Sequence, residues 1–98
     1  MSSQKDKNID EFSNFKAVLK KAQGLKHVGE LKLSSRSDKK YMIYDELTKK
    51  WVHFGQMGYE DFTKHRNIKR RHQFRERNHK WKDAPQNTPA FLSYYLLW

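Results

Sequence analysis

The segment from Lys64 to Lys82, KHRNIKRRHQFRERNHKWK, is the part of this sequence that most restricts how the chain can fold. It has nine lysines and arginines against one acid, Glu76, so it carries +8 of the formal net charge of +10. Helix propensities favour a helix over residues 67–80, and Pro85 breaks it. Like charges this dense repel one another on a helix, and a bound counter-charge relieves that repulsion. The segment therefore predicts a basic helix that binds a polyanion.

The rest of the composition predicts one small domain with a thin core. The chain has 98 residues and a mean hydropathy of −1.13, but 14% of its residues are aromatic. Disordered chains are poor in aromatic residues, so we expect an aromatic core in residues 9–98 and a flexible N-terminus in residues 1–8. The absence of cysteine excludes disulfides and cysteine-based zinc sites. No signal peptide or transmembrane segment is evident, so we expect a protein that is not secreted.

Helical apolar spacing appears at both ends of the chain. Residues 9–23 predict a helix capped by Asn8, with Phe12, Phe15 and Leu19 on its apolar face. Residues 88–98 predict a short helix that Thr88 caps and Pro89 begins. The i, i+3, i+4, i+7 spacing of the second segment predicts an aromatic stripe made of Phe91, Tyr94, Tyr95 and Trp98.

The middle of the chain predicts β-structure. Residues 41–54 contain the runs YMIY and WVHF, which are typical of a β-hairpin with Tyr41 and Ile43 on one face of the first strand. Two strands alone are marginal in water, so helices or a third strand must support them, and a short strand is expected near Leu31 to Leu33. Residues 34–40 are polar and predict a flexible linker. The fold class that follows is α+β, a small single domain.

Several of these motifs resemble a known group of proteins. They are HFG at residues 53–55, DFTKH at 61–65, the arginine-rich helix with Phe74 and Arg77-x-His79, and the ending LSYYLLW. Together they are similar to a family of small basic proteins from nucleocytoplasmic large DNA viruses, the giant viruses, and their relatives, over roughly residues 39–98. The resemblance implies a viral origin and no particular mechanism. Members of that family carry an aspartate where this chain has Asn67, which argues against a catalytic or metal-binding carboxylate there.

The basic helix offers two kinds of contact to nucleic acid. The guanidinium group binds phosphate oxygens in pairs, and Lys or Arg side chains neutralise the backbone. On a helix, Arg70, Phe74, Arg77 and Trp81 share one stripe, so Phe74 and Trp81 either anchor the helix to the hairpin or stack on unpaired bases. The predicted nucleic-acid-binding residues are Lys64, Arg66, Lys69, Arg70, Arg71, Arg75, Arg77, Lys80 and Lys82.

The histidines and carboxylates give a weaker pattern. His65, His72 and His79 are seven residues apart, which places them in a line about 10.5 Å apart on a helix, too far for one metal ion. A nuclease would use His53 or His65 as the general base, with Asp61 to orient it. The acids outside the basic segment, such as Asp45, Glu46, Glu60 and Asp61, offer it only partial neutralisation. We therefore expect no cofactor, no metal and no catalytic residue.

The sequence leaves three functions open. The favoured one is non-enzymatic nucleic-acid binding by a small viral protein, associated with DNA or RNA in the virion or in the host cytoplasm or nucleus. A second is a structural module of the virion whose C-terminal aromatic segment binds a capsid or host protein, and exposure of Phe91, Tyr95 and Trp98 would favour it. The third is the histidine-based nuclease.

Overall fold

The computed structural model describes residues 9–98, and the predictions for residues 1–8, including the Asn8 cap, lie outside the described part. The α+β class is confirmed: helices flank a three-stranded antiparallel sheet. The elements, in chain order, are the 3-10 helix η2 (Ile9–Glu11), α1 (Phe15–Ala22), β1 (Val28–Leu33), β2 (Lys39–Asp45), β3 (Lys50–Gln56), α2 (Phe62–His65), α3 (Ile68–Arg77), the 3-10 helix η3 (His79–Asp83), α4 (Pro89–Leu92) and the π-helical turn η4 (Ser93–Leu97).

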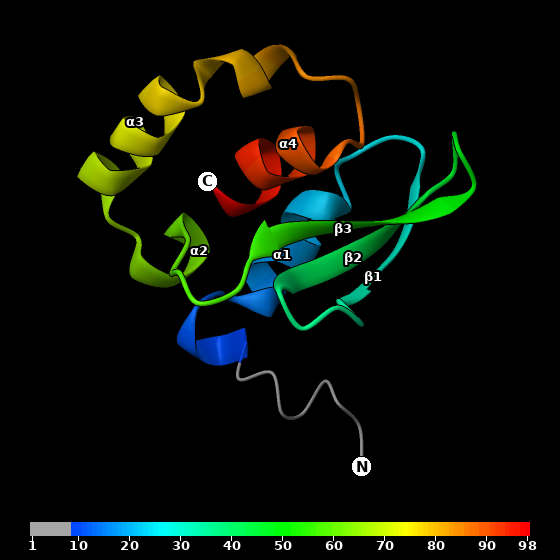
Figure 1. The fold of residues 1–98 in the computed structure, drawn as a ribbon, viewed down its shortest axis with the longest axis horizontal. Coiled ribbons are helices and arrows are strands. Elements are labelled where there is room, and N and C mark those ends of the chain that lie inside the picture. The colour runs from blue at the N-terminus through cyan, green and yellow to red at the C-terminus, as the bar shows by residue number, and fades with distance from the viewer. Residues whose placement is uncertain (1–8) are drawn as a thin grey trace.

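The elements are arranged around the C-terminal helical segment. Figure 1 shows α4 and η4 between the sheet and an arch made of α3 and η3. Residues far apart in sequence therefore meet near the end of the chain.

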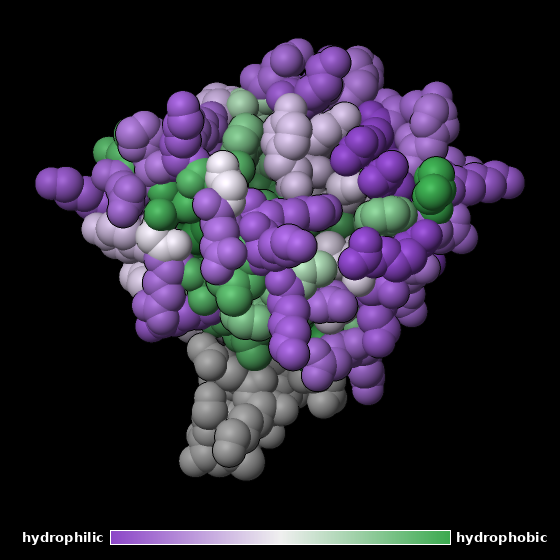
Figure 2. All heavy atoms as spheres, turned by 180° about the vertical axis from the view of Figure 1, so that it is seen from behind, coloured by the Kyte–Doolittle hydropathy of each residue, from purple (hydrophilic) through white to green (hydrophobic). Residues whose placement is uncertain are grey.

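No helix in residues 9–98 is long and apolar enough to cross a membrane. Hydrophilic side chains cover most of the opposite face of the molecule, including the side where α3 lies, with apolar patches between them (Figure 2).

The sheet is a meander of order β1–β2–β3. β2 is the central strand and places Tyr41 opposite Phe54 of β3 and Ile43 opposite Leu31 of β1. These four side chains are buried and point to one face of the sheet, as the alternation within residues 41–54 predicts. Because β1 pairs with β2, the expected hairpin is supported by a third strand.

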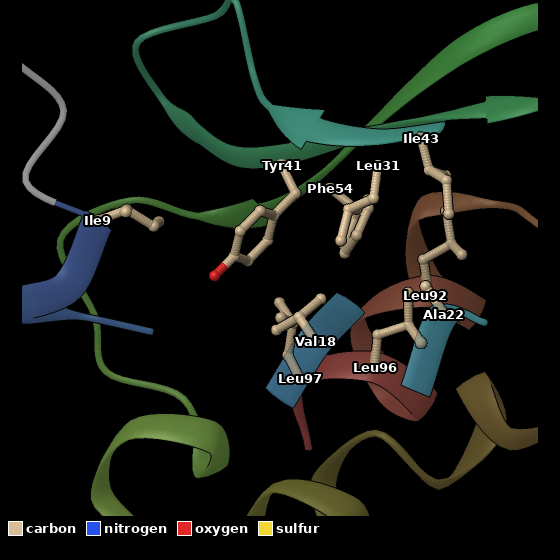
Figure 3. Close-up of a cluster of buried hydrophobic side chains, with 10 residues drawn as sticks. All are labelled: Ile9, Val18, Ala22, Leu31, Tyr41, Ile43, Phe54, Leu92, Leu96 and Leu97. Atoms are coloured by element: carbon tan, nitrogen blue, oxygen red, sulfur yellow. The ribbon is translucent and has the colours of Figure 1, made fainter. Parts of the chain in front are cut away.

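The core lies between this face and the helices. Figure 3 shows Tyr41, Phe54 and Ile43 directed towards side chains of the helical layer. That layer contributes Val18 and Ala22 from α1 together with Leu92, Leu96 and Leu97 from the C-terminal segment.

Gly55 allows the C-terminal segment to approach the edge of the sheet. It has a φ of +83°, and a Cβ atom there would lie 2.9 Å from Leu97 Cδ1 and 3.1 Å from Lys40 Cβ. A larger residue would be strained by this φ and by the short contacts. The close approach of β3 and Leu97 forms one side of the groove described below.

The helix expected over residues 9–23 is divided in two. Ser13 leaves the helical path and is buried, where its hydroxyl accepts a hydrogen bond from Tyr41 Oη at 2.7 Å. Asn14 then caps α1 by accepting a hydrogen bond from the backbone N–H of Ala17. The helical path breaks because these polar residues bond to other parts of the protein.

The linker expected over residues 34–40 is a short ordered connection. Ser34 and Lys40 are buried, and β2 already begins at Lys39. Ser34 Oγ accepts a hydrogen bond from Arg36 N–H at 3.0 Å and lies 2.6 Å from His53 Nδ1. Polar composition predicted flexibility here because the side-chain partners are distant in sequence.

The C-terminal segment packs through leucines more than through the expected aromatic stripe. Leu92, Leu96 and Leu97 are at most 1% exposed, whereas Tyr95 is 38% exposed and donates a hydrogen bond to the carbonyl of Lys82. The predicted Thr88 cap and the first-turn Pro89 are confirmed. Residues 93–97 are π-helical, which changes the angle between successive side chains and rotates the aromatic residues away from the α-helical spacing.

Candidate nucleic-acid interface

The basic segment contains two helices joined by a sharp break. α2 ends at His65, Arg66 has a left-handed φ of 55°, and Asn67 caps α3 by accepting from Arg70 N–H. α3 ends at Arg77, and a 3-10 helix follows, so the predicted continuous helix over residues 67–80 is too long at its C-terminal end. Asn78 is the C-terminal cap, and its side chain donates to the carbonyl of Phe74.

The arginines of α3 occupy two flanks of the helix. Residues in an α-helix are about 100° apart around the axis, so Arg70 and Arg77 lie on one side of Phe74 and Arg71 and Arg75 on the other. Phe74 itself faces the protein, stacked on Trp98 with ring centroids 4.4 Å apart and an interplanar angle of 7°. The predicted anchor to the hairpin is therefore wrong: Phe74 fastens α3 to the end of the C-terminal segment.

The first flank borders a groove of about 630 Å³. One wall is the predicted stripe of α3 and η3, and the opposite walls come from β2, β3, the connection to α2 and the C-terminal segment. The groove is lined by Lys39, Lys40, Gly55, Gln56, Tyr59, Glu60, Arg70, Phe74, Arg77, Trp81, Pro89, Ala90, Ser93, Leu97 and Trp98. The structure thus brings the whole predicted stripe, Arg70, Phe74, Arg77 and Trp81, to one cavity.

Aromatic rings form part of the groove surface. Trp81 meets Phe74 edge to face, with centroids 5.9 Å apart, and is 36% exposed. Tyr59, from the connection between β3 and α2, is 69% exposed. Large apolar side chains are more often buried than exposed in a monomer, so a groove that exposes two aromatic residues is suited to a flat apolar ligand group.

The charge in the groove is predominantly positive. Arg70 and Arg77 are exposed, and Glu60 is the acidic residue among those that line the groove. Lys40 also lines it, but its ammonium group is bonded to buried Asp61 at 3.0 Å. The two arginines of the first flank therefore outnumber Glu60, the acidic residue that lines the groove with them.

The second flank of α3 packs against α2 and the C-terminal segment. Arg71 lies over the ring of Phe62 at 4.5 Å, and Arg75 lies over Tyr94 at 5.4 Å and donates to the carbonyl of Trp98 at 3.1 Å. Both side chains are half-buried and contribute to packing. Arg71 and Arg75 thus make packing contacts within the protein, and their contact with phosphates stays a prediction.

Lys21 of α1 lies near the second flank of α3. Burial, followed by the charges of Arg66, Arg75 and Arg71, lowers the pKa of the Lys21 ammonium group. Four cations, Lys21, Arg66, Arg71 and Arg75, are therefore close enough to repel one another. No sequence pattern places Lys21 in this group, because α1 and α3 are about fifty residues apart along the chain.

The remaining predicted residues are exposed. Lys69 is exposed on α3, as are His72 and Glu76, whose Nε2 and Oε1 atoms lie 3.0 Å apart. Lys64 lies on α2, and Lys80 and Lys82 lie on η3. These exposed residues are accessible to a ligand, but they are spread over three helices and do not form one cluster.

None of the nine basic residues of the segment pairs with the side chain of an aspartate or glutamate within residues 9–98. The ion pairs of the described chain are Lys32–Glu30, Arg36–Asp38, Lys40–Asp61 and His72–Glu76. Asp45 is also occupied elsewhere, because it accepts hydrogen bonds from Asn87 and Thr48. The acids outside the basic segment therefore leave its lysines and arginines unneutralised.

The carboxylate of Asp61 is held by a network of hydrogen bonds inside the protein. It is fully buried, accepts hydrogen bonds from Lys40 and from the backbone N–H and hydroxyl of Thr63, and caps α2. The Thr63 hydroxyl in turn accepts from Asn14 N–H at 3.0 Å, which joins α2 to the start of α1. These bonds account for Asp61 without a catalytic role.

The histidines are not in the line that their spacing predicts. His65 ends α2, whereas His72 is on α3 and His79 on η3, because the left-handed Arg66 separates the first from the others. His65 Nδ1 accepts from Asn67 N–H at 2.9 Å, and burial, followed by the charge of Arg70, lowers its pKa. In the part of the chain that the structure describes, no three His, Asp or Glu residues are placed to hold a metal ion.

Comparison with known proteins gives a family without an assigned activity. No curated protein and no solved structure matches the chain. The family of unknown function DUF5754 matches residues 29–82, which extend from β1 to η3 and make up more than half of the 98 residues. The match includes α3, and it identifies no enzymatic family. The chain therefore belongs to the DUF5754 family, whose function is not known.

Proposed function

We propose that this protein binds nucleic acid without catalysing a reaction, mainly through the phosphate backbone. The observation that carries the proposal is the basic segment: it has nine cations, and none of them pairs with an aspartate or glutamate side chain in residues 9–98. Such a cluster is unfavourable in the free protein and becomes favourable when phosphates replace the missing counter-charges.

The arrangement of the arginines suits contact with a backbone. Arg70 and Arg77 border the groove, while Lys21 and Arg66 extend the positive surface around the other side of α3. Contacts spread over such a surface position a nucleic acid but read few base edges. A viral origin, and a role with the genome or in the virion, belong to the same proposal and rest on the resemblance of the sequence motifs.

The two alternatives have less support. Phe91 and Trp98 are half-buried against the core cluster, and Tyr95 is exposed but bonds to Lys82, so these residues offer a capsid or host protein less aromatic surface than a fully exposed stripe would. For a nuclease, Asp61 is buried and paired with Lys40. The geometry therefore favours binding over either alternative.

A salt titration tests the proposal. Binding of labelled duplex DNA should weaken with a log–log slope of about −0.9 for each phosphate contact, so four contacts imply a loss on the order of 100-fold between 50 and 200 mM salt. The variant Arg70→Gln/Arg77→Gln should lower the slope by about 1.8, the equivalent of two contacts. Fluorescence anisotropy at several salt concentrations measures both.

The matched control is Lys16→Gln/Lys50→Gln, which removes the same charge from exposed positions on α1 and β3. It should change the slope far less. Equal effects of the two double variants would mean that net charge alone matters, and no binding at low salt would refute the proposal. Arg71 and Arg75 are left intact because their substitution would also disturb packing.

A further inference from the structure

We propose that the groove between α3 and the C-terminal segment holds an unpaired base of a single-stranded nucleic acid, with Trp81 as the stacking surface and Arg70 and Arg77 as contacts to the adjoining phosphates. This inference rests on the proposed function and goes further, because it assigns the kind of strand and the place of the base.

The aromatic surface gives the first reason. Phe74 already stacks on Trp98, so one of its faces is occupied within the protein. Trp81 borders the same groove and is 36% exposed. Any base offers a flat π-surface to such a ring, so stacking of this kind is tolerant of sequence.

The position of the cations gives the second reason. Arg70 and Arg77 each lie about one helical turn from Phe74, one before it and one after it, and about two turns from each other. A base in the groove therefore has a guanidinium group on either side of Phe74. A base that is paired and stacked in a duplex cannot enter a cavity and meet a ring face, whereas an unpaired base can.

The size and charge of the groove are consistent with this occupant. Its volume of about 630 Å³ is in the range of roughly 300–1,000 Å³ usual for ligand sites. A basic or neutral apolar peptide would leave both arginines without counter-charges. A strand supplies an aromatic group and anions together, which is the combination that the groove presents.

A strand with abasic sites distinguishes the contribution of the base to binding from that of the phosphates. The probe is a fluorescein-labelled single-stranded DNA 12-mer, compared with the same length and charge carrying abasic sites at its centre, and with the RNA counterpart. The whole protein should bind the intact strand about 5- to 150-fold more tightly than the abasic one, the range expected for one stacked base. Equal affinity would overturn the inference while leaving phosphate binding in place, and failure of all strands to bind at low salt would overturn both.

Two tryptophans of similar exposure provide matched variants. Trp81→Ala should lose the preference for the intact strand, and Trp81→Phe should retain part of it. Trp51, on β3, is 38% exposed and does not line the groove, so Trp51→Ala should keep the preference. The salt slope should be unchanged in Trp81→Ala, because no cation is removed. If Trp51→Ala loses the preference and Trp81→Ala keeps it, the base binds elsewhere. The abasic comparison on the unsubstituted protein decides the question even if Trp81→Ala folds poorly.

Discussion

Lys40 and Asp61 form an ion pair that is buried at both ends, with side chains 3% and 0% exposed. Removing two charges from water is costly, and their attraction compensates only when further hydrogen bonds complete the environment. Thr63 supplies those bonds to Asp61. Burial lowers the pKa of Lys40, and the neighbouring Asp61 charge opposes that shift. The pair joins the central strand to α2, so it positions the helix that precedes α3.

Substitution of Lys40 alone should be strongly destabilising. Lys40→Met leaves the Asp61 carboxylate buried without its partner, and we expect a loss of about 3–5 kcal/mol in the free energy of unfolding. Adding Asp61→Asn, which keeps an oxygen to accept from Thr63, should recover part of the loss. Urea denaturation measures both. The control Lys50→Met, at an exposed position, should stay within about 0.5 kcal/mol, and a similar value for Lys40→Met would contradict the structural role.

His65 should make the fold sensitive to mild acid. Burial lowers its pKa below 6.5, the ordinary value, so the unfolded chain binds the proton more readily than the folded one. The unfolded state then holds more protons as the pH falls below about 6.5, and stability decreases in that direction. Thermal melts between pH 7.5 and 5.5 should show a smaller decrease for His65→Phe, which keeps a ring against Trp98. His72→Gln, at an exposed position, should behave like the unsubstituted protein; if it alone removes the dependence, His65 is not responsible.

At the scale of elements, the C-terminal segment shows how far a helical pattern can predict packing. Its presence, its cap and its contact with the sheet all follow from residues 88–98 of the sequence. Which side chains are buried does not follow, because the π-helical turn η4 displaces the aromatic residues from the α-helical stripe. Leu96 and Leu97, at 1% exposure, take the central positions instead.

Leu96→Ala should therefore affect stability more than loss of the polar group of Tyr95. Deleting a buried leucine side chain costs about 2–5 kcal/mol, because a cavity remains. Tyr95→Phe removes only the hydrogen bond to the Lys82 carbonyl and should cost about 0.5–1.5 kcal/mol. Chemical denaturation of the two variants gives the comparison. A larger effect of Tyr95→Phe would mean that the η3 contact, and not the leucine core, holds the segment.

The predicted start of the basic helix at residue 67 agrees with the Asn67 cap of α3, but the left-handed turn at Arg66 before it was not predicted. Residues 64–80 have no proline or glycine, and the hydrophilic pattern continues without interruption. Asn67 caps α3, and the left-handed Arg66 donates its N–H to the carbonyl of Phe62 at the end of α2. This left-handed residue turns the chain between the two helices and places His65 apart from the other histidines.

At the scale of the whole molecule, the candidate site joins parts that no local pattern relates. The stripe Arg70, Phe74, Arg77 and Trp81 follows from helical spacing, and the structure places all four at one groove. Tyr59, Trp98 and Lys21 could not be assigned, because their neighbours come from distant segments. Long-range placement, which depends on the meander and the C-terminal segment, supplied the rest of the site.

Lys21 gives a test of this long-range placement. The sequence alone suggests that the lysines at the end of α1 matter little for binding. The structure changes that expectation for Lys21, which repels Arg66, Arg71 and Arg75 until an anion is present. Lys21→Gln should reduce the salt slope by about 0.9, one phosphate contact on duplex DNA. Lys20→Gln, the neighbouring exposed residue, is the control. Equal slopes for the two variants would exclude the α1 side from the interface.

The position of α3 has one more consequence. None of its residues is buried, and aromatic and arginine contacts hold it to the rest of the protein. Segments with few buried apolar contacts open locally at a lower free energy than core strands. The amide hydrogens of α3 should therefore exchange with solvent faster than those of β2. A nucleic-acid strand bound between α3 and the sheet should slow that exchange. The helix that carries five of the nine basic residues of the segment would then be the part of the fold that a ligand completes.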